Sequence, residues 1–501
     1  MSEPYYITTA ISYPNGPPHI GHAYEAIAAD AMARFQRSQG RDVRFQTGTD
    51  EHGLKMAQAA RGQGIEPRAF ADKMARLFQE MCDALNVSYD RFIRTSEADH
   101  YRASQALWTA MEERGDLYLD RYEGWYSVRD EAYYEEDELV LAEDGTKLSP
   151  QGTPVEWTVE ESWFFRLSKY QQPLLDHYAA NPGFIQPDSR RNEVVRFVEG
   201  GLKDLSISRT SFDWGVPVPG SSNHVMYVWL DALTNYITGL GFPDDTELWR
   251  RYWPADVHLI GKDVVRFHAV YWPAFLMSAG IALPKEIYGH GFLLSRGEKM
   301  SKSVGNVVDP MVLSERFGVD ALRYFLLREV PFGQDGSYSA EAIVNRANAE
   351  LANSFGNLAQ RTLSMVFKNL GGVLPPSGEA PEDLELLELV NRACGNDVPE
   401  AFERFAFSVG IDAWLHAVFA CNAYVDAQAP WALRKTDPDR MAAVLGTLVA
   451  AVRELTRAIA PIIPASADKL MTLIDAGEGG APIPQPTPLF PRLELEQEEL
   501  A

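Results

Sequence analysis

The chain has 501 residues, of which 46% are hydrophobic and 23% charged, a balance typical of a soluble globular protein with more than one domain. Its net charge of −24 argues against indiscriminate binding of nucleic acid, although it allows a local basic track on an acidic body. Three widely spaced cysteines exclude a disulfide framework or a zinc ribbon. No apolar run reaches membrane-spanning length or forms a secretion signal, so we expect a cytoplasmic protein without a membrane span.

The amino-terminal sequence follows the order strand, helix, strand. Residues 5–11 (YYITTAI) form a run of β-branched and aromatic side chains that predicts a buried strand. The turn-forming residues 13–18 (YPNGPP) precede a helix with an apolar face that ends near Gly40. A second strand is predicted over residues 43–47, before the segment 48–53 (GTDEHG). Because this order opens a parallel sheet covered by helices, the sequence predicts an α/β fold.

The rest of the chain divides into segments of different character. Short aromatic stretches and charged turns over residues 117–214 indicate an insertion, and strands are predicted again at residues 225–230 and 257–260. Beyond about residue 335 the pattern is almost wholly helical. We therefore expect two halves of the α/β domain at residues 1–116 and 215–285, the insertion at 117–214, a loop-containing region at 286–340, a helical domain at 341–480 and a tail at 481–501.

The tetrapeptide His19-Ile20-Gly21-His22 lies where the first predicted strand turns into the helix. The start of a helix offers backbone N–H groups and the positive end of the helix dipole to a phosphate. His19 and His22 are three residues apart and share a face of the first turn, while Gly21 lets a flat base approach the backbone. The motif therefore predicts nucleotide binding, and its alternative is a helix with two solvated histidines.

The pentapeptide Lys299-Met300-Ser301-Lys302-Ser303 follows the glycine-containing stretch 289–292 (GHGF). Two lysines with small hydroxyl residues on a loop suit a mobile clamp over a polyphosphate, whereas the alternative is an exposed basic loop. A given tetrapeptide occurs by chance in a chain of this length with a probability of roughly 0.3%, and a given pentapeptide roughly twenty times less often. The presence of both motifs therefore excludes coincidence.

With both motifs in one chain, the sequence resembles the class I aminoacyl-tRNA synthetases, and among them the methionyl-tRNA synthetases. The likeness covers nearly the whole chain and is carried by residues 10–16 (AISYPNG), 49–53 (TDEHG), 161–165 (ESWFF), 227–232 (YVWLDA), 260–263 (IGKD), 267–268 (FH), 353–361 and 430–431 (PW). It implies a Rossmann-like parallel-sheet catalytic domain with a mixed insertion domain, followed by an all-α anticodon-binding helical bundle. It also implies that residues 286–340 hold the KMSKS loop and a stem-contact region.

The resemblance also implies the reaction. L-methionine and ATP, the latter as its Mg²⁺ complex, would give methionyl-adenylate and pyrophosphate, and the methionyl group would then pass to the 3′ end of tRNA(Met), including the initiator tRNA. The methionine carboxylate is already a nucleophile, so catalysis requires positioning and charge neutralisation and no Ser or Cys triad. No further module is expected after the helical region, and we therefore expect a monomer.

The functional residues of the family carry over to named positions. The resemblance implies catalytic roles for His19, His22, Lys299 and Lys302, and ATP binding by His19, Gly21, His22, Gly261, Lys262, Asp263 and Lys302. It implies methionine binding by Ile11, Tyr13, Asp50, Trp229, Ala232, Leu233, Tyr236, Val264, His268 and Trp272. It implies anticodon binding by Asn353, Asn357, Arg361 and Trp431.

A methionine pocket needs apolar, polarizable walls because a thioether is only a weak hydrogen-bond acceptor. Val264, His268 and Trp272 are spaced four residues apart and share one helix face, although core packing would explain the same stripe. Leu233 stands where the family often has proline, so that wall of the pocket differs from the family pattern. Asp50 is expected to accept the substrate ammonium group.

The insertion lacks the Cys-x-x-Cys pairs with which many methionyl enzymes bind zinc. The corresponding stretches, residues 126–131 and 147–150, contain no cysteine, so we expect no structural zinc. Packing of four aromatic side chains is expected to stabilise this knuckle instead: Trp125, Tyr126, Tyr133 and Tyr134. At roughly a hundred residues, the insertion is also too short for a separate editing domain.

Three other functions would each leave a different mark on the sequence. A small nucleotidyltransferase of the same superfamily would lack the second motif, the long insertion and the helical region. A catalytically silent relative would be expected to have lost a histidine or lysine from the motifs, and both motifs are intact. Leucyl, isoleucyl and valyl enzymes usually carry a much larger editing insertion, and the cysteinyl enzyme depends on zinc thiolates.

Overall fold

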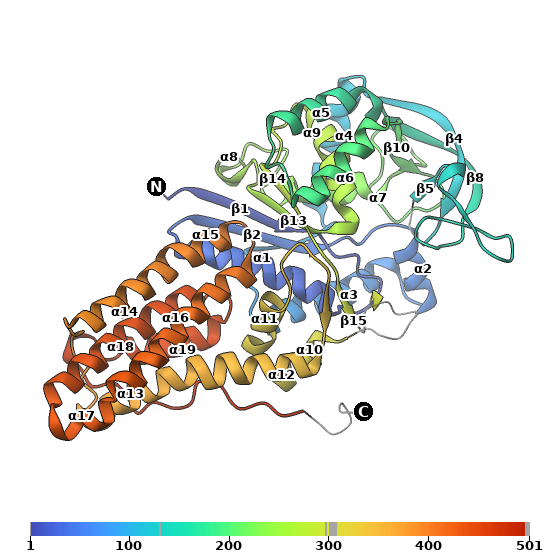
Figure 1. Ribbon diagram of the computed structural model, residues 1–501. Helices are drawn as coiled ribbons and strands as arrows, with labels where there is room; N and C mark the ends of the chain where they lie inside the picture. Colours follow the sequence, from blue (N-terminus) through green and yellow to red (C-terminus); the bar gives the residue numbers. More distant parts are fainter. Residues whose placement is uncertain (1, 130–131, 296–297, 300–307, 496–501) are drawn as a thin grey trace. The chain divides into compact units, whose positions relative to one another are not determined.

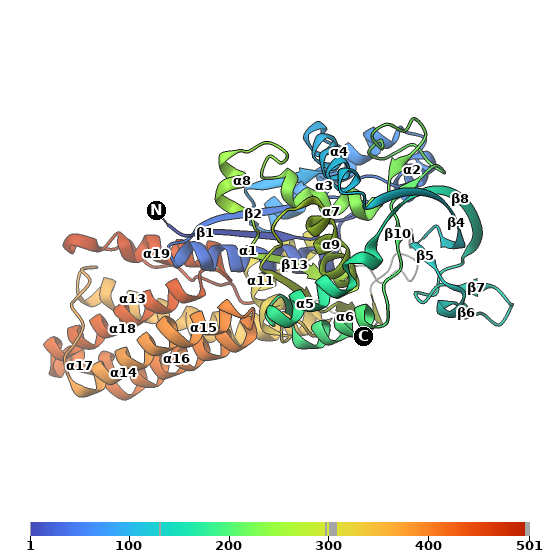
Figure 2. The ribbon, with the colours of Figure 1, turned by 90° about the horizontal axis from the view of Figure 1, so that it is seen from above.

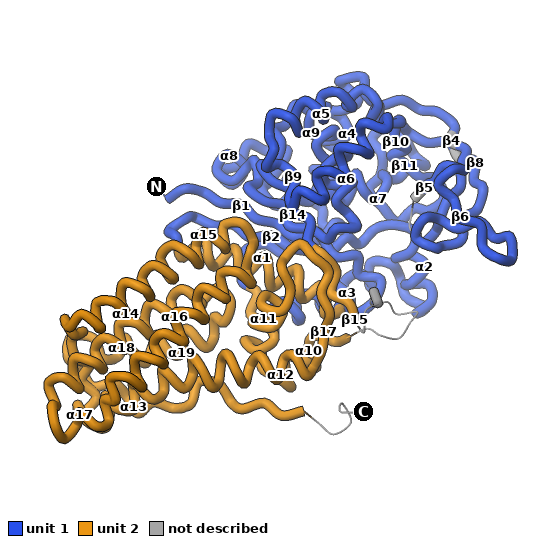
Figure 3. Tube along the Cα trace, in the orientation of Figure 1, with its two compact units in different colours: residues 1–18, 39–83, 88–290 blue, residues 19–38, 84–87, 291–501 orange. Residues whose placement is uncertain are grey.

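The computed structural model describes residues 2–129, 132–295, 298–299 and 308–495. The chain forms two compact units, drawn in blue and orange in Figure 3. Unit 1 comprises Met1–Pro18, Gln39–Asp83 and Ser88–His290, and unit 2 comprises His19–Ser38, Ala84–Val87 and Gly291–Ala501. Each unit therefore combines segments that are far apart in the sequence.

Unit 1 is built on a six-stranded parallel sheet with the strand order β3-β2-β1-β13-β14-β9 (Figure 1). Its strands are β1 (Pro4–Thr9), β2 (Asp42–Thr49), β3 (Arg91–Arg94), β9 (Ile185–Gln186), β13 (Val257–Gly261) and β14 (Glu286–His290). Ile7 of β1 pairs with Phe45 of β2 on one side and with Val257 of β13 on the other. Because all neighbouring strands are parallel, their carboxyl ends lie along one edge of the sheet, where α/β proteins bind their ligands.

Helices connect these strands. Those of unit 1 are α2 (Leu54–Gly62), α3 (Pro67–Ala84, which ends at the boundary with unit 2), α4 (Ala98–Glu113), η2 (Leu167–Tyr170), α5 (Gln171–Ala180), α6 (Asp188–Glu199), α7 (Val228–Thr238), α8 (Glu247–Tyr252), η3 (Lys262–Val264), η4 (Phe267–Tyr271) and α9 (Trp272–Ala279). The strand predicted at residues 225–230 is wrong. Only β12 (Val225–Met226) is extended, and it pairs antiparallel with β11 (Ser208–Arg209). The apolar residues that follow belong to the buried helix α7, and a short apolar run does not distinguish a strand from a buried helix.

The insertion is an antiparallel sheet with the strand order β10-β8-β4-β5. Its strands are β4 (Leu117–Ser127), β5 (Ala132–Tyr134), β8 (Glu156–Phe165) and β10 (Leu205–Ser206), and a small hairpin of β6 (Val140–Leu141) and β7 (Lys147–Leu148) follows the turn η1 (Glu136–Glu138). Figure 2 shows β4 and β8 as a strongly curved ribbon. They pair in register from Leu117 opposite Phe165 to Tyr126 opposite Glu156.

Unit 2 is mainly helical. It contains α1 (Ile20–Ser38), β15 (Leu293–Ser295), β16 (Glu298–Lys299), α10 (Pro310–Phe317), α11 (Val319–Arg328), β17 (Gly336–Tyr338), α12 (Ala340–Arg346), η5 (Ala347–Gly356), α13 (Asn357–Asn369), α14 (Pro381–Arg392), η6 (Ala393–Asp397), α15 (Val398–Glu403), α16 (Phe407–Gln428), α17 (Pro430–Thr436), α18 (Pro438–Ile459), α19 (Pro464–Asp475) and η7 (Glu478–Gly480). Helices α14, α16 and α18 pack side by side (Figure 1). The predicted α/β fold with a mixed insertion and a helical carboxyl-terminal region is confirmed.

Helix α12 continues through η5 into α13 without a break. The residues at the two junctions, Ala347 and Asn357, both have right-handed helical dihedral angles. The segment η5 is π-helical, with wider turns than an α-helix. The helical pattern in the sequence gave no indication of these wider turns.

Arg323 holds several segments of unit 2 together from the buried side of α11. Its side chain is fully buried and lies 2.7 Å from the carboxylate of Asp30 on α1, which is also fully buried. It also donates to the carbonyls of Leu85, Pro461 and Ile462 at 3.0–3.2 Å. One guanidinium group therefore fixes α1 against three other stretches of the unit, which suits its planar arrangement of five donors.

Candidate active site

The loops that follow β1 and β2 are joined by backbone hydrogen bonds at the carboxyl edge of the sheet. The N–H of Ser12 donates to the carbonyl of Gly48 at 2.9 Å, and the N–H of Asp50 donates to the carbonyl of Ser12 at 2.8 Å. Asp50 is buried, whereas Ile11 and Tyr13, on either side of Ser12, are half-buried. Three of the predicted methionine-binding residues are therefore held on adjacent loops of unit 1.

Tyr236 and His268 form an uncharged polar pair beside this edge. The Tyr236 hydroxyl lies 2.6 Å from Nε2 of His268, and Nδ1 of the same ring lies 2.9 Å from the carbonyl of Val264. Because a carbonyl only accepts, the ring carries its proton on Nδ1, and the Tyr236 hydroxyl donates to Nε2. Burial lowers the pKa of His268 to about 4, so the imidazole is neutral at physiological pH.

Aromatic rings surround this pair. The Tyr236 ring lies 6.0 Å from Trp272 and 4.0 Å from His258, centroid to centroid. Trp229 stacks on Phe267 with a centroid distance of 3.6 Å and an interplanar angle of 8°. The remaining predicted residues of this group, Ala232 and Leu233, are buried on α7. Leu233, Tyr236 and Trp272 belong to one hydrophobic cluster, against which Trp229 and Val264 pack.

Phe267 and His258 also lie in this group of rings, although neither was predicted to bind methionine. Phe267 stands in the family motif at residues 267–268, but its stacking on Trp229 joins residues that are distant in the sequence and shows only in three dimensions. Nδ1 of His258 lies 2.7 Å from the Thr8 hydroxyl, and burial lowers the pKa of this imidazole well below its usual value. Its position in the middle of a strand gave no signal for a site.

The tripeptide Gly261-Lys262-Asp263 lies at the end of β13, where strand gives way to the short helix η3. A side chain at Gly261 would place its Cβ 2.8 Å from Oδ1 of Asp263, so the carboxylate folds back over this glycine. A larger residue at position 261 would therefore displace the Asp263 carboxylate from the carboxyl edge of the sheet.

In unit 2, His19 and His22 are stacked at the start of α1, with a centroid distance of 3.8 Å. The N–H of Gly21 donates to Nδ1 of His19, and the N–H of His19 donates to Nδ1 of His22, both at 3.1 Å. Since both Nδ1 atoms accept, each ring carries its proton on Nε2. Both imidazoles can therefore act as Nε2–H donors, which is the role that phosphate binding requires.

The absence of a side chain at Gly21 also makes room for the His19 ring, in addition to the close approach of a base that the sequence predicts. A Cβ at this position would lie 2.9 Å from Cε1 of His19, closer than such contacts allow. The imidazole of His19 therefore occupies the space that a side chain at position 21 would need.

The lysines of the second motif lie at the edge of what the structure describes. Lys299 lies in β16, but its side chain and the whole of Lys302 are outside the described residues.

The four predicted anticodon-binding residues lie in the helical unit. Asn353 and Asn357 are exposed, one helical turn apart, and Arg361 follows on the next turn. The guanidinium carbon of Arg361 lies 5.5 Å from the ring centroid of Trp431, whose side chain is 52% exposed on α17. Arg361 also lies 3.4 Å from the carboxylate of Asp426. An exposed tryptophan beside a cation is a suitable surface for stacking an unpaired base.

Two family models match the chain: "tRNA synthetases class I (M)" over residues 5–363 and "Anticodon binding domain of methionyl tRNA ligase" over residues 410–486. The chain belongs to the class I methionyl-tRNA synthetases. The methionine–tRNA ligase of Brucella suis biovar 1 is 58% identical to this synthetase, over 98% of this chain and 98% of the relative. That of Mycobacterium tuberculosis strain H37Rv is 56% identical, over 99% of each chain.

Solved structures give the same result. Mycobacterium tuberculosis methionyl-tRNA synthetase in complex with methionyl-adenylate superposes with a TM-score of 0.94 at 56% identity, covering 98% of this chain and 100% of that chain. The free form of the Mycobacterium tuberculosis enzyme superposes with a TM-score of 0.88 at 52% identity, covering 99% of each chain. The fold of this synthetase is therefore that of a methionyl-tRNA synthetase over nearly its full length.

A buried cluster of hydroxyl groups stabilises the knuckle of the insertion. The hydroxyl of Thr153 lies 2.6 Å from that of Ser127 and 2.9 Å from that of Ser149, and Ser149 also accepts from the N–H of Thr153 at 3.3 Å. Of the four aromatic residues predicted to pack here, Tyr126 and Tyr133 lie 4.7 Å apart, centroid to centroid. Within the described parts of the insertion, the knuckle is therefore stabilised by aromatic packing, by neutral hydrogen bonds and by the ion pair of Lys147 with Glu136.

Two further findings concern metals and membranes. Among the residues that the structure describes, no three His, Cys, Asp or Glu side chains gather in a way that could hold a metal ion. In the same part of the chain, no helix combines the length and the apolar character needed to cross a bilayer. The prediction that the protein holds no structural zinc stays a prediction that elemental analysis can test.

Proposed function

We propose that this synthetase is a methionine–tRNA ligase, which activates L-methionine with ATP to methionyl-adenylate and pyrophosphate and then transfers the methionyl group to the 3′ end of tRNA(Met). The observation that carries this proposal is its similarity, over nearly the full length, to methionyl enzymes, one of them solved with methionyl-adenylate. The chemistry of the side chains described above supports the same conclusion.

Methionine is recognised, in this proposal, by an uncharged pocket and one carboxylate. The neutral pair Tyr236 and His268 gives the thioether an uncharged wall, and the indole of Trp272 offers a polarizable aromatic surface. A charged side chain would lose its hydration in such a pocket without gaining a partner. Asp50 accepts the substrate ammonium group, since a buried carboxylate forms a strong charge-assisted contact.

The first reaction needs no protein nucleophile. A carboxylate oxygen of methionine attacks the α-phosphorus of ATP, and the bond from this phosphorus to the bridging oxygen breaks, so that its electron pair leaves with pyrophosphate. The Nε2–H groups of His19 and His22 donate to phosphate oxygens, and Lys299 and Lys302 neutralise the leaving pyrophosphate. Lys262 and Asp263 bind ATP, and Mg²⁺ enters with the phosphates as part of that substrate.

In the second reaction, a hydroxyl of the terminal ribose of tRNA attacks the carbonyl carbon of the adenylate, and AMP leaves. Asn353, Asn357 and Arg361 contact the anticodon, and Trp431 stacks on one of its bases. We further propose that the enzyme is a cytoplasmic monomer that charges initiator as well as elongator tRNA(Met).

Amino-acid-dependent ATP–pyrophosphate exchange, screened over the twenty amino acids, tests the proposed function. Methionine should support exchange far above all others, because the pocket is uncharged and matched to a thioether. His22→Ala should abolish exchange, whereas His416→Ala, at an exposed position of α16, should not change it. Exchange that depends on another amino acid, or that survives His22→Ala, would refute the proposal.

A further inference from the structure

Asp231 lies on α7 between two predicted methionine-binding residues, and its side chain does not face solvent. It is fully buried, and each of its carboxylate oxygens lies next to one imidazole nitrogen. Nδ1 of His52 is 2.6 Å from Oδ2, and Nε2 of His100 is 2.7 Å from Oδ1. The carboxylate therefore joins α7 to the loop after β2, which carries His52, and to α4, which carries His100.

The carboxylate is ionised. Burial by itself raises the pKa of Asp231, but the charge interaction with His52 and the hydrogen bonds from His100 and His52 outweigh burial and lower that pKa to about 2. Both imidazole N–H groups therefore donate to a charged acceptor, and such hydrogen bonds are stronger than neutral ones. An amide in place of the carboxylate would turn one of its two acceptors into a donor that faces an N–H group.

The two histidines are also held at their far sides. Nε2 of His52 lies 3.0 Å from the hydroxyl of Tyr101, and its ring packs edge-on against Trp214 at a centroid distance of 5.3 Å. Nδ1 of His100 lies 3.0 Å from the hydroxyl of Thr238, at the end of α7. The carboxylate, the two rings and their outer partners thus form a connected buried network within unit 1.

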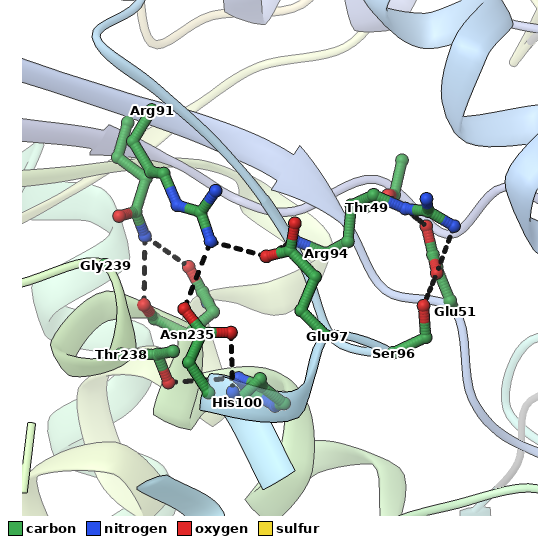
Figure 4. A network of polar contacts seen from close by, with 12 residues as sticks. Thr49, Glu51, Arg91, Arg94, Ser96, Glu97, His100, Asn235, Thr238 and Gly239 are labelled. Atoms are coloured by element: carbon green, nitrogen blue, oxygen red, sulfur yellow. Dashed lines mark hydrogen bonds and ion pairs between the residues drawn. The ribbon is translucent and has the colours of Figure 1, made fainter. Parts of the chain in front are cut away.

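The loop that carries His52 also carries Asp50, and a second network fixes the residue between them. Glu51 is buried, and its two carboxylate oxygens lie 2.7 and 3.0 Å from the guanidinium of Arg94 and next to the hydroxyl of Ser96 (Figure 4). The Trp214 indole N–H donates to the backbone carbonyl of Glu51 at 2.5 Å. This short loop is therefore fixed from two sides, by Arg94 through Glu51 and by Asp231 through His52.

We propose that Asp231 is a positioning residue for the amino acid substrate: it sets the place of the ammonium acceptor Asp50 relative to the side-chain walls on α7. Asp231 follows Trp229 by two residues and precedes Ala232 on the same helix. One methionine has to place its ammonium group at Asp50 and its thioether against the walls on α7 at the same time, so binding is tightest when the loop and the helix keep one spacing. The inference rests on the proposed function.

Asp231→Asn tests this role, because asparagine has the size of aspartate but lacks the second acceptor. Three ligands separate the two ends of the site: L-methionine, L-methioninol, which has the ammonium but no carboxylate, and 4-(methylthio)butanoate, which has the carboxylate but no ammonium. We expect Kd to rise roughly 10- to 100-fold for methionine and methioninol, as for other displacements of about 1 Å. The Kd values of 4-(methylthio)butanoate and ATP should change by less than about 3-fold.

Conservative variants of the two histidines provide the matched control. The amide nitrogen of asparagine can replace Nδ1, and that of glutamine can replace Nε2, so His52→Asn and His100→Gln should retain much more methionine affinity than His52→Ala and His100→Ala. If the histidines had a purely structural role, the affinity for all ligands would fall together. The loss would then not depend on whether the replacing side chain puts a donor at the position of Nδ1 or Nε2.

The outcomes separate the inference from the proposed function. If Asp231→Asn weakens binding of methionine and of its two analogues equally, or of none of them, the positioning role is refuted. Partial unfolding of this variant does not obscure the result. Methioninol and 4-(methylthio)butanoate bind the same folded molecules, so unfolding changes both apparent Kd values by the same factor and leaves their ratio, which is the quantity tested, unchanged. If the wild-type protein supports no methionine-dependent exchange, the proposed function itself fails, whatever the variant does.

Discussion

Replacement of Arg323 by Met should strongly destabilise the helical unit. Arg323 and its partner Asp30 are both fully buried, so the variant leaves a buried carboxylate that still pairs with Arg34, 2.8 Å away and 25% exposed. It also removes the donor to the carbonyls of Pro461 and Ile462. Loss of one partner of a buried ion pair costs about 3–5 kcal/mol.

Urea unfolding followed by far-ultraviolet circular dichroism measures this effect. At a slope of about 3 kcal/mol per molar urea, the midpoint should fall by about 1–2 M. Arg457→Ala is the control, because the pair of Arg457 with Glu454 is largely exposed and contributes less than about 1 kcal/mol. The double variant with Asp30→Asn should be more stable than Arg323→Met alone, since it removes a buried carboxylate that has lost its fully buried partner. A midpoint for Arg323→Met no lower than that of Arg457→Ala would refute this reasoning.

Trp431→Ala should lower kcat/KM for tRNA roughly 10- to 100-fold and affect ATP–pyrophosphate exchange far less, because stacking on one base contributes about 1–3 kcal/mol; equal losses in both assays would point to a structural role. Gly21→Ala should slow exchange roughly 10- to 100-fold, because the new Cβ displaces the His19 ring, and an unchanged rate would show that this ring position is unimportant. The pKa of His268 lies near 4 in the folded protein and near 6.5 when unfolded, so the unfolded chain takes up the proton first and stability falls as pH drops from about 6.5 to about 4. The thermal midpoint should therefore fall more over this range for wild type than for His268→Gln, and parallel profiles would contradict the assignment.

The sequence predicted those features that depend on local order. The first strand, the turn and the helix that begins at Ile20 follow from β-branched residues, prolines and an apolar face, and the structure has them within a few residues. The stripe of Val264, His268 and Trp272 was recognised from its spacing and from the family motifs. Its helix includes the π-helical turn η4, which the spacing of four did not anticipate.

The features that the sequence could not predict depend on contacts between distant residues. Asp231 binds one histidine 179 residues away and another 131 residues away, and no local pattern indicates either partner. The same holds for Arg323, whose carboxylate partner is 293 residues distant. From the sequence alone, such polar residues are expected at the surface, where most polar residues lie. Only the folded structure shows that they are buried and hydrogen-bonded to one another.

The wide turns of η5 lie among the residues proposed to bind the anticodon. A π-helical turn corresponds to an α-helix that has gained one residue, and Asn353 lies within this segment while Asn357 and Arg361 follow it. Removal of one residue between Ala347 and Gly356 would restore α-helical winding and bring the residues around Asn353 into a narrower turn, while the phase of Asn357 and Arg361 relative to α12 would change little. The length of this segment thus sets how Asn353 is presented beside Asn357 and Arg361, because the wide turn carries one more residue than an α-helical turn would.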